Sequence, residues 1–377
     1  METPFIYNRP VDNQNFVGYD DLSEHIAGNI LQMRHTIVLG ARKTGKTSLL
    51  DSVAARVHSE RSDYIICHVD IKDADDKENI LAILADGIIR TISEDLREAA
   101  ENVRTFLPGI DPRIEVRSGE SAKFAITFNN SDVAAAMKKF MDLPETVAAG
   151  KGKKIMIVVD NFEKVLELSD CEEFICELEG TVSGYRSVVC CFCANKRHMM
   201  SELLRHSKLG EIISMTKPSE KKLAEYISSI FSQTAKYIDE DTTGLIVSLV
   251  EGHPYYVQQL AQISWLHTYV VCTREIVLQS HRAMVDQSSM VFEDLTGMFT
   301  SQQICYLRAI VAGEQVISTT DILHKYGITS ATSASRSKSA LLQKGIIDVN
   351  EGKTYVINPL FAFWLKSQKK TLPLSNK

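Results

Sequence analysis

The stretch Gly40-Ala41-Arg42-Lys43-Thr44-Gly45-Lys46-Thr47 decides how the rest of the sequence is interpreted. It follows an apolar run, Thr36 to Leu39, and opens a helix-forming segment. Glycines at both ends let the chain curl tightly, so that backbone N–H groups and the helix N-terminus face an anion. In such a Walker A loop the lysine reaches the β- and γ-phosphates and the following hydroxyl holds Mg²⁺. The sequence therefore predicts an ATP·Mg²⁺ site in which Lys46 and Thr47 have these roles.

Short β-type runs alternate with helical stretches through the first two hundred residues, which predicts a parallel α/β sheet of the P-loop NTPase kind. The runs are His35 to Leu39, Tyr64 to Asp70, Ile155 to Asp160, Ser187 to Ala194 and Glu211 to Met215. Between the second and third runs lie a helix-like stretch, Lys77 to Glu98, and a hairpin, Arg113 to Val116 and Lys123 to Phe128, that turns at Gly119. We interpret the hairpin, at about residues 105–130, as an insertion.

Polar side chains at the ends of two predicted strands extend the phosphate site. Asp160 ends a buried run, Ile155 to Val159, at the position where a Walker B acid binds the Mg²⁺ shell. An apolar run that ends in Asp is common in itself. This run lies one strand beyond the strand that follows Walker A, which favours its assignment as Walker B. Asn195 ends the next strand and is expected to contact the γ-phosphate or the attacking water; the alternative is an ordinary polar loop residue.

Beyond Pro218 apolar residues recur at helical spacing, which predicts a helical domain without strands. Thr300-x-x-Gln303 is a capping-box pattern that opens a further helix through Ala312. Two helical segments and an extended hairpin follow, which together predict a winged helix-turn-helix: Thr319 to Lys325, Ser330 to Lys344, and Gly345 to Ile347 with Tyr355 to Ile357, turning through Asn350-Glu351-Gly352. The predicted domains are an α/β core at 1–217, a helical lid at 218–297 and a winged helix at 298–377.

The composition is that of a globular protein of two or three domains, because the 377 residues are 44% hydrophobic and 24% charged. No apolar run approaches the length of a membrane span, and the N-terminus lacks the features of a signal peptide, so we expect a cytoplasmic protein without membrane contact. Cys190, Cys191 and Cys193 crowd one apolar strand and are interpreted as core residues, since residues three apart on a strand face opposite sides.

Charge is distributed unevenly along the chain. Residues 298–377 hold ten Lys or Arg and four Asp or Glu, a net charge of +6, whereas the rest, with 32 basic and 44 acidic side chains, carries −12. The C-terminal domain is therefore the candidate footprint for a polyanion.

Five sets of residues recur in an order that is typical of one family. They are Phe16 to Leu22, Gly40 to Leu50, Asp160 to Glu163, Gly252 to Tyr256, and Lys344 to Ile347 with Asn358 to Leu365. They resemble the N-terminal box, Walker A, Walker B, the Gly-x-Pro motif of the lid and the end of the winged helix in the archaeal-type ATPases of the STAND/AAA+ group. The resemblance covers nearly the whole chain and implies the strand order 5-1-4-3-2.

The same resemblance implies roles for individual residues. Phe16, Val17 and Gly18 would pack near the adenine, and His253 and Pro254 would lie over the nucleotide, although His253 could merely pack. The predicted nucleotide-binding residues are these five with Gly40, Ala41, Arg42, Lys43, Thr44, Gly45, Lys46, Thr47 and Ser48. The predicted catalytic residues are Lys46, Asp160, Glu163 and Asn195, and the predicted metal ligands are Thr47 and Asp160.

Two positions depart from the family pattern. Asn161 stands where a glutamate usually polarises the attacking water, and an amide cannot act as a general base. Either Glu163 substitutes or turnover is slow. Tyr19 stands where the N-terminal box normally carries arginine, which changes the contact on the adenine side.

These features favour a nucleotide-dependent switch: ATP·Mg²⁺ bridges the core and the lid, and hydrolysis or release moves the winged helix. One alternative is a scaffold that binds ATP or ADP without hydrolysis, which Asn161 supports. Another is a DNA-binding regulator whose helix Ser330 to Lys344 offers Arg336 and Lys338 to the major groove. The winged helix could equally contact a protein, and the nucleotide could control oligomerisation.

Overall fold

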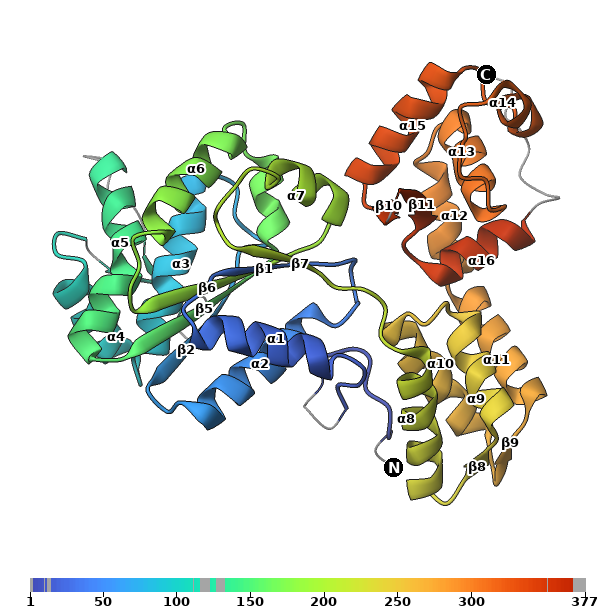
Figure 1. The fold of residues 1–377 in the computed structure, drawn as a ribbon, viewed down its shortest axis with the longest axis horizontal. Helices are drawn as coiled ribbons and strands as arrows, with labels where there is room; N and C mark the ends of the chain where they lie inside the picture. Colours follow the sequence, from blue (N-terminus) through green and yellow to red (C-terminus); the bar gives the residue numbers. More distant parts are fainter. Residues whose placement is uncertain are drawn as a thin grey trace.

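A computed structural model describes residues 3–9, 11, 15–110, 112–115, 123–126, 133–350 and 352–368. The chain forms an α/β core followed by two smaller, mainly helical bodies (Figure 1). Within the described residues, no helix has the combination of length and apolar character that crossing a membrane requires. Four residues of the two predicted hairpins lie outside the described residues: the strand ends Val116 and Phe128 and the turn residues Gly119 and Glu351.

The core is built on a sheet of five parallel strands in the order β2-β5-β6-β1-β7. Its strands are β1 (Thr36–Leu39), β2 (Tyr64–Asp70), β5 (Lys154–Asp160), β6 (Val188–Ala194) and β7 (Glu211–Ser214). Numbered along the sequence, this is the order 5-1-4-3-2 that the family resemblance implied. Because all five strands are parallel, their carboxyl ends lie at one edge of the sheet, where ligands bind in open α/β folds.

Helices cover both faces of the sheet, as Figure 1 shows. One face packs on α1 (Asp20–Leu31) and α2 (Lys46–Glu60). The other packs on α3 (Lys77–Thr91), α5 (Val133–Lys151), α6 (Cys171–Val182) and α7 (Arg197–Leu203). Every residue of β6 is buried, since alternate side chains enter the two cores. Cys190 lies in one core and Cys191 and Cys193 in the other, as expected for structural cysteines.

The segment between β2 and β5 departs from the prediction in one respect. The predicted single helix from Lys77 to Glu98 is two helices, α3 and α4 (Leu96–Phe106). The carboxylate of Asp95 caps α4 by accepting hydrogen bonds from the backbone amides of Arg97 and Glu98, so it starts a new helix where the pattern suggested a continuous one. The hairpin is present as β3 (Pro112–Glu115) and β4 (Lys123–Ile126), which pair antiparallel.

The lid is a bundle of helices around one apolar core. It comprises α8 (Glu220–Gln233), α9 (Glu240–Leu249), α10 (Pro254–His267), α11 (Arg274–Gln287) and α12 (Ser289–Gly297). The expectation that it lacks strands was wrong, because β8 (Tyr237–Ile238) and β9 (Val271–Cys272) pair in parallel. Two-residue strands are too short to produce a periodic pattern in the sequence. The N-terminal segment also belongs to this body, because Phe5 is buried in the lid core beside Tyr226 and Phe231.

The C-terminal body is the winged helix that the sequence predicted. It contains α13 (Ser301–Val311), α14 (Thr320–Tyr326), α15 (Ala331–Gln343), the antiparallel wing β10 (Ile347–Asn350) and β11 (Lys353–Val356), and α16 (Pro359–Ser367). Thr300 and Gln303 form the predicted capping box. The wing contacts the core, because the buried carboxylate of Asp348 accepts a hydrogen bond of 3.4 Å from the backbone amide of His198 on α7.

The core and the lid meet closely at Gly18. This residue has φ +90°, and a Cβ atom placed on it would lie 2.7 Å from Cβ of Pro218, where the chain leaves the core. The hydrogen bond between Lys222 and Asp20, 3.0 Å long, ties α8 to α1 beside this contact. Only a glycine can occupy this position without moving the lid relative to the core.

We expect Gly18→Ala to destabilise the protein by about 1–3 kcal/mol, because it adds both backbone strain and a steric overlap with Pro218. Gly28→Ala is the matched control: a Cβ atom there has no neighbour within 4 Å, and alanine favours the helix by up to about 1 kcal/mol. Urea unfolding followed by circular dichroism measures both. Similar midpoints for the two variants would contradict the role given to Gly18.

Candidate functional site

The loop between β1 and α2 has the geometry of an anion-binding site. Gly45 has φ +92° and Lys43 has φ +63°, and these left-handed conformations curl the chain around a central space. Within the described part of the chain, the backbone amides of Arg42 to Gly45 donate no hydrogen bond to protein atoms. Free amides in a curled loop, followed at once by the N-terminus of α2, attract an anion.

Lys46 lies at the centre of this loop and is only 7% exposed. Its Nζ donates to the backbone oxygens of Gly40 and Ala41, at 3.0 and 2.7 Å, and to Oδ1 of Asn195, at 2.7 Å. Burial lowers the pKa of Lys46, whereas neighbouring acidic groups, including Glu163 and Asp160, oppose this shift. A buried ammonium group whose partners are mainly neutral oxygens is a suitable binding group for phosphate.

Thr47 and Asp160 meet beside the loop. The Thr47 hydroxyl donates to Oδ2 of Asp160 at 2.9 Å, which joins the start of α2 to the end of β5. A hydroxyl oxygen and a carboxylate oxygen in contact are the hard ligands that Mg²⁺ prefers, so these two residues fit the predicted ion.

Glu163 contacts Asn195, the residue that accepts a hydrogen bond from Lys46. It is 5% exposed, and its two carboxylate oxygens accept from the backbone amide and the side-chain Nδ2 of Asn195, at 2.8 and 2.6 Å. Asn195 in turn accepts from Lys46. In the structure Glu163 therefore orients Asn195, and its role as a base stays a prediction.

Asn161 is held from two sides at the end of β5. It has φ +57°, a conformation that asparagine tolerates better than most residues. Its backbone amide donates to Oδ1 of Asp160 at 2.9 Å, and its Nδ2 donates to Oδ1 of Asp70 at 2.7 Å. The sequence analysis placed Asp70 at the end of a predicted strand and gave it no role in the site. Its position at the end of β2, in register with Asp160, was the signal that could have placed it here.

A cavity of about 600 Å³ extends from the loop to the lid. Twelve of the predicted site residues line this cavity: Phe16, Val17, Arg42, Lys43, Thr44, Gly45, Lys46, Thr47, Ser48, Asp160, Asn195 and Pro254. The other predicted residues do not line it; they are Gly18, Gly40, Ala41, Glu163 and His253. The prediction missed the N-terminal segment from Ile6 to Arg9, which crosses the cavity, and the lid residues Leu223, Tyr255 and Gln258. Nothing in a single sequence indicates that a non-periodic N-terminal segment lies on a distant domain.

The N-terminal box contributes aromatic rings to the cavity. Phe16 stacks on Tyr19 with ring centroids 5.3 Å apart. The Tyr19 hydroxyl donates to the backbone oxygens of Thr44 and Thr216, at 3.4 and 3.0 Å, so it fixes the loop to the segment after β7. The tyrosine that replaces the family's arginine thus has a structural contact of its own.

His253 and its neighbours hold the lid against the loop. His253 is 6% exposed; its Nε2 lies 3.3 Å from the backbone oxygen of Arg42, and its ring packs on Tyr256. In the ligand-free structure this histidine does not line the cavity, and its contact with the nucleotide stays a prediction. Lys43 Nζ lies over the ring of Tyr255, 3.8 Å from its centroid, at the edge of the cavity.

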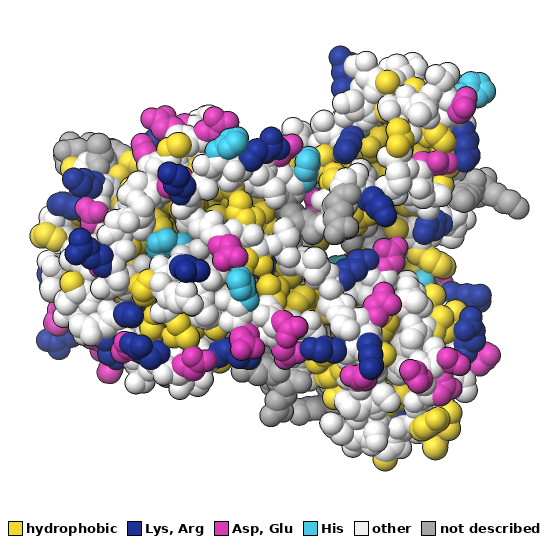
Figure 2. Space-filling model, viewed as in Figure 1, with side chains coloured by type: hydrophobic (Ala, Val, Ile, Leu, Met, Phe, Trp, Pro, Cys, Tyr) yellow, Lys and Arg dark blue, Asp and Glu magenta, His cyan; other side chains and the backbone are white. Residues whose placement is uncertain are grey.

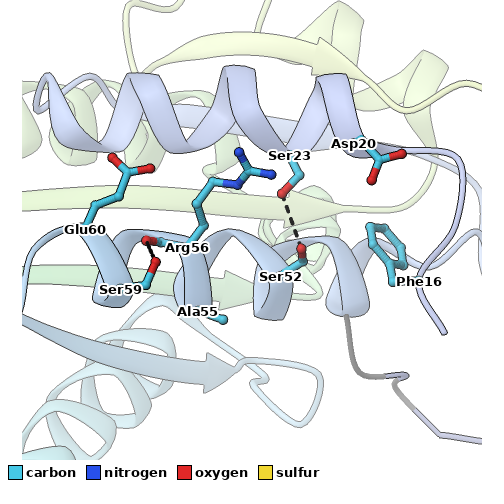
Figure 3. Close-up of a pocket in the computed structure, with 8 residues that line it drawn as sticks. All are labelled: Phe16, Asp20, Ser23, Ser52, Ala55, Arg56, Ser59 and Glu60. Carbon is cyan, nitrogen blue, oxygen red and sulfur yellow. Dashed lines mark hydrogen bonds between the residues drawn. The ribbon is translucent and has the colours of Figure 1, made fainter. Parts of the chain in front are cut away.

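A second hollow, of about 510 Å³, lies between α1 and α2 (Figure 3). Ser23 on α1 and Ser52 on α2 point toward each other and form a hydrogen bond of 3.3 Å, while Arg56 and Glu60 project from α2. Apart from Phe16, none of the predicted nucleotide residues lines it. The chemistry of a phosphate site is therefore concentrated in the first cavity.

The sheet and the loop have the fold of a P-loop NTPase, and a helical lid and a C-terminal winged helix follow them. Residues 290–367 match a protein family described as "Probable winged helix domain". No curated protein matches the sequence significantly.

Solved structures share the whole arrangement. A Walker-type ATPase of Pyrococcus abyssi superposes with a TM-score of 0.66 at 12% identity, over 96% of this chain and 99% of that one. The ORC2 protein of Aeropyrum pernix, solved with ADPNP and ADP, gives 0.55 at 11% identity, over 95% and 98%. The ORC1 protein of Aeropyrum pernix, solved with DNA, gives 0.51 at 14% identity, over 96% and 94%. At these identities the likeness is one of fold, and it is the fold that the sequence resemblance to archaeal-type ATPases implied.

We expect the stability of the protein to fall between pH 6.5 and about 4 because of His253. Burial, opposed by the bond to the Arg42 carbonyl, lowers the pKa of His253 from 6.5 to about 4, so in this window only the unfolded state binds the proton. The loss reaches at most about 3 kcal/mol at the acid end. Urea unfolding of His253→Phe should show a flatter dependence on pH than the parent, whereas His58→Phe, at an exposed site, should keep the parent's slope. Equal slopes for His253→Phe and the parent would be the contrary result.

Proposed function

We propose that the protein is an ATP-binding AAA+ switch that hydrolyses ATP slowly. ATP·Mg²⁺ binds between the core, residues 1–217, and the lid, residues 218–297, and controls the winged helix at 298–377. One observation carries this proposal: Lys46, Thr47, Asp160 and Asn195 converge at one end of a cavity whose other end the lid closes. The shared fold of P-loop ATPases supports it.

Binding follows from the groups already in place. Backbone amides of the loop and the Lys46 ammonium group bind the phosphates, and Thr47 with Asp160 would hold Mg²⁺. When bound, the ion neutralises charge on the phosphate oxygens and so lowers the barrier to phosphoryl transfer. Arg42 and Lys43 add positive charge at the rim of the cavity.

Slow hydrolysis follows from the way Asn161 is held. An amide cannot remove a proton from water, but its oxygen can accept a hydrogen bond and orient the water, as glutamine does in some GTPases. Nδ2 of Asn161 donates to Asp70, so Oδ1 is the atom that can accept a hydrogen bond from a water in the cavity. Asp70 is thus a positioning residue, and the chain orients water without a general base at this position.

The path from phosphate to winged helix is short. Glu163 holds Asn195, Asn195 holds Lys46, and α7 begins two residues after Asn195. The same helix donates from His198 to Asp348 of the wing. When a phosphate competes for Lys46, it alters the partner of Asn195 and thereby the end of β6 on which α7 depends. This arrangement supports nucleotide control of the wing's position.

We expect Lys46→Ala to weaken ATP binding by about 10- to 100-fold, the loss of charge-assisted hydrogen bonds to phosphate. Titration with a fluorescent ATP analogue measures the affinity. Lys153→Ala, an exposed lysine at the opposite end of β5, is the control and should bind as the parent does. The binding role of the loop fails if Lys46→Ala retains the parent's affinity.

We expect Asn161→Glu to raise the rate of phosphate release about tenfold or more, because it restores a general base. Asp160→Asn should lower the rate, and Asp70→Ala should lower kcat with little change in KM, since Asp70 acts through Asn161. A phosphate-release assay at saturating ATP measures all three. Equal rates for the parent and Asp160→Asn would favour a scaffold that binds ATP without hydrolysis.

We propose a protein contact as the output of the winged helix, in preference to DNA. The recognition helix α15 exposes Arg336, but Lys338 is half-buried and the other outward residues are mainly small and polar. On the face shown in Figure 2 the Lys and Arg side chains of this domain are spread and do not form a stripe. The wing already contacts α7, because Asp348 accepts a hydrogen bond from His198. These features suit a domain that docks on proteins.

A further inference from the structure

Five large apolar side chains gather at the tip of the lid, around the short strands β8 and β9. They are Tyr237, Leu266, Tyr269, Val270 and Val271, and we call this group the lid-tip patch. All five are exposed, and Tyr269 is 95% exposed. Figure 2 shows hydrophobic side chains gathered at this end of the lid. Single exposed apolar residues are normal on a protein surface, whereas a contiguous group marks an interaction site.

The pairing of β8 with β9 brings the members of the lid-tip patch together. Tyr237 and Val271 are partners in the parallel pair, and the backbone amide of Tyr237 donates to the oxygen of Val270 at 2.7 Å. Ile238 and Cys272, the next residues of the two strands, are buried in the lid core. Because successive side chains of a strand face opposite sides, Tyr237 and Val271 both face solvent. The patch therefore has no part in the lid core, and it does not line the nucleotide cavity.

Acidic side chains border the lid-tip patch. The exposed acids at the starts of the two helices that follow β8 and β9 are Asp239, Glu240, Asp241 and Glu275. Two basic residues, Lys236 and Arg274, lie in the same segments, and Nζ of Lys236 lies over the ring of Trp265, 4.0 Å from its centroid. The lid as a whole, residues 218–297, holds five Lys or Arg and ten Asp or Glu, a net charge of −5.

This negative charge distinguishes between possible partners of the lid-tip patch. Two patches packed face to face would bring acidic borders together, and such like-charge contacts are unfavourable. An anionic lipid surface attracts basic segments and repels an acidic one. An apolar segment flanked by lysines complements both the apolar centre of the patch and its acidic border.

The chain contains such a segment outside the described residues. After Gln368 the sequence reads Lys369-Lys370-Thr371-Leu372-Pro373-Leu374-Ser375-Asn376-Lys377, with three lysines, no acid and an apolar centre. The other stretches outside the described residues lack this combination. Nine extended residues span about 30 Å, which is long enough to cross the patch. Figure 1 shows β8 and β9 at the end of the lid farthest from the winged helix, which favours a segment from a second copy.

We propose that residues 369–377 of one copy dock on the lid-tip patch of a second copy. Leu372 and Leu374 contact the exposed aromatic and aliphatic side chains, while Lys369 and Lys370 face the acidic border. The association weakens as salt is added, because its charges lie at an exposed border. The inference does not depend on the proposed function, since no residue of the patch lines the nucleotide cavity.

Sedimentation velocity of the full chain over a range of concentrations tests the proposal. We expect Tyr269→Ser on the patch and Leu374→Ser on the segment each to weaken the association about tenfold or more, because each removes an apolar contact. Val316→Ser replaces an exposed apolar residue of the winged helix and is the control, which should associate as the parent does. Circular dichroism should show an unchanged fold for Tyr269→Ser, because the replaced side chain makes no core contact.

Charge reversal tests the pairing of the lysines with the acidic border. Lys369→Glu with Lys370→Glu should weaken the association, and so should Glu240→Lys with Asp241→Lys. All four changes in one chain should restore the association to within about threefold of the parent, because opposite charges then meet again. Asp239 is kept in these variants because it caps α9.

A fluorescein-labelled peptide of residues 369–377 separates this contact from any other interface. It should bind the parent and bind Tyr269→Ser at least about tenfold more weakly. The proposal is overturned if the parent stays monomeric and does not bind the peptide, if Leu374→Ser associates as tightly as the parent, or if the fourfold charge reversal restores nothing. Binding of the parent, but not of Tyr269→Ser, to vesicles of equimolar phosphatidylserine and phosphatidylcholine, without self-association, would assign the patch to a membrane instead.

Discussion

The rest of this structure depends on one buried ammonium group. Lys46 lies where the end of β1, the start of α2 and the end of β6 meet, and it is held by two loop carbonyls and by Asn195. A buried cation needs hydrogen-bond partners on every side, so it fixes the curl of the loop and the position of Asn195 together. The loop amides and the hydroxyl of Thr47 are thereby placed around one space, and a phosphate entering that space competes directly for Lys46.

The two chemical ends of the cavity belong to different bodies. The core supplies charge and hard oxygen ligands, whereas the lid and the N-terminal segment supply apolar and aromatic surfaces, among them Ile6, Tyr7, Leu223 and Tyr255. The N-terminal segment is fixed to the lid by burial of Phe5 and by its amide, which donates to Gln262 at 3.2 Å, and it reaches the core through Val11 and Ser48. A ligand that needs both ends holds the bodies in one arrangement, which is the physical basis of a switch.

The sequence predicted the fold nearly in full because its signals are local. The strand runs, the capping box at Thr300 and the glycine loop each depend on neighbouring residues, and the family resemblance supplied the strand order. The errors have equally local causes. Asp95 divides a helix whose apolar pattern continues past it, and the paired strands β8 and β9 are too short to show a period. Roles that depend on where a side chain points, such as that of Glu163, were not accessible in this way.

By itself the sequence determined a P-loop sheet, a helical lid, a winged helix and the residues of the loop. Hydrophobic periodicity, helix capping and turn chemistry each depend on residues that are close together in the sequence. Only the tertiary structure decided which polar groups meet across the chain. It turned Glu163 toward Asn195, gave Asn161 the partner Asp70 and placed His253 beside the loop. These contacts join residues that lie tens or hundreds of positions apart, and their geometry follows from the packing of whole elements, which no local pattern encodes.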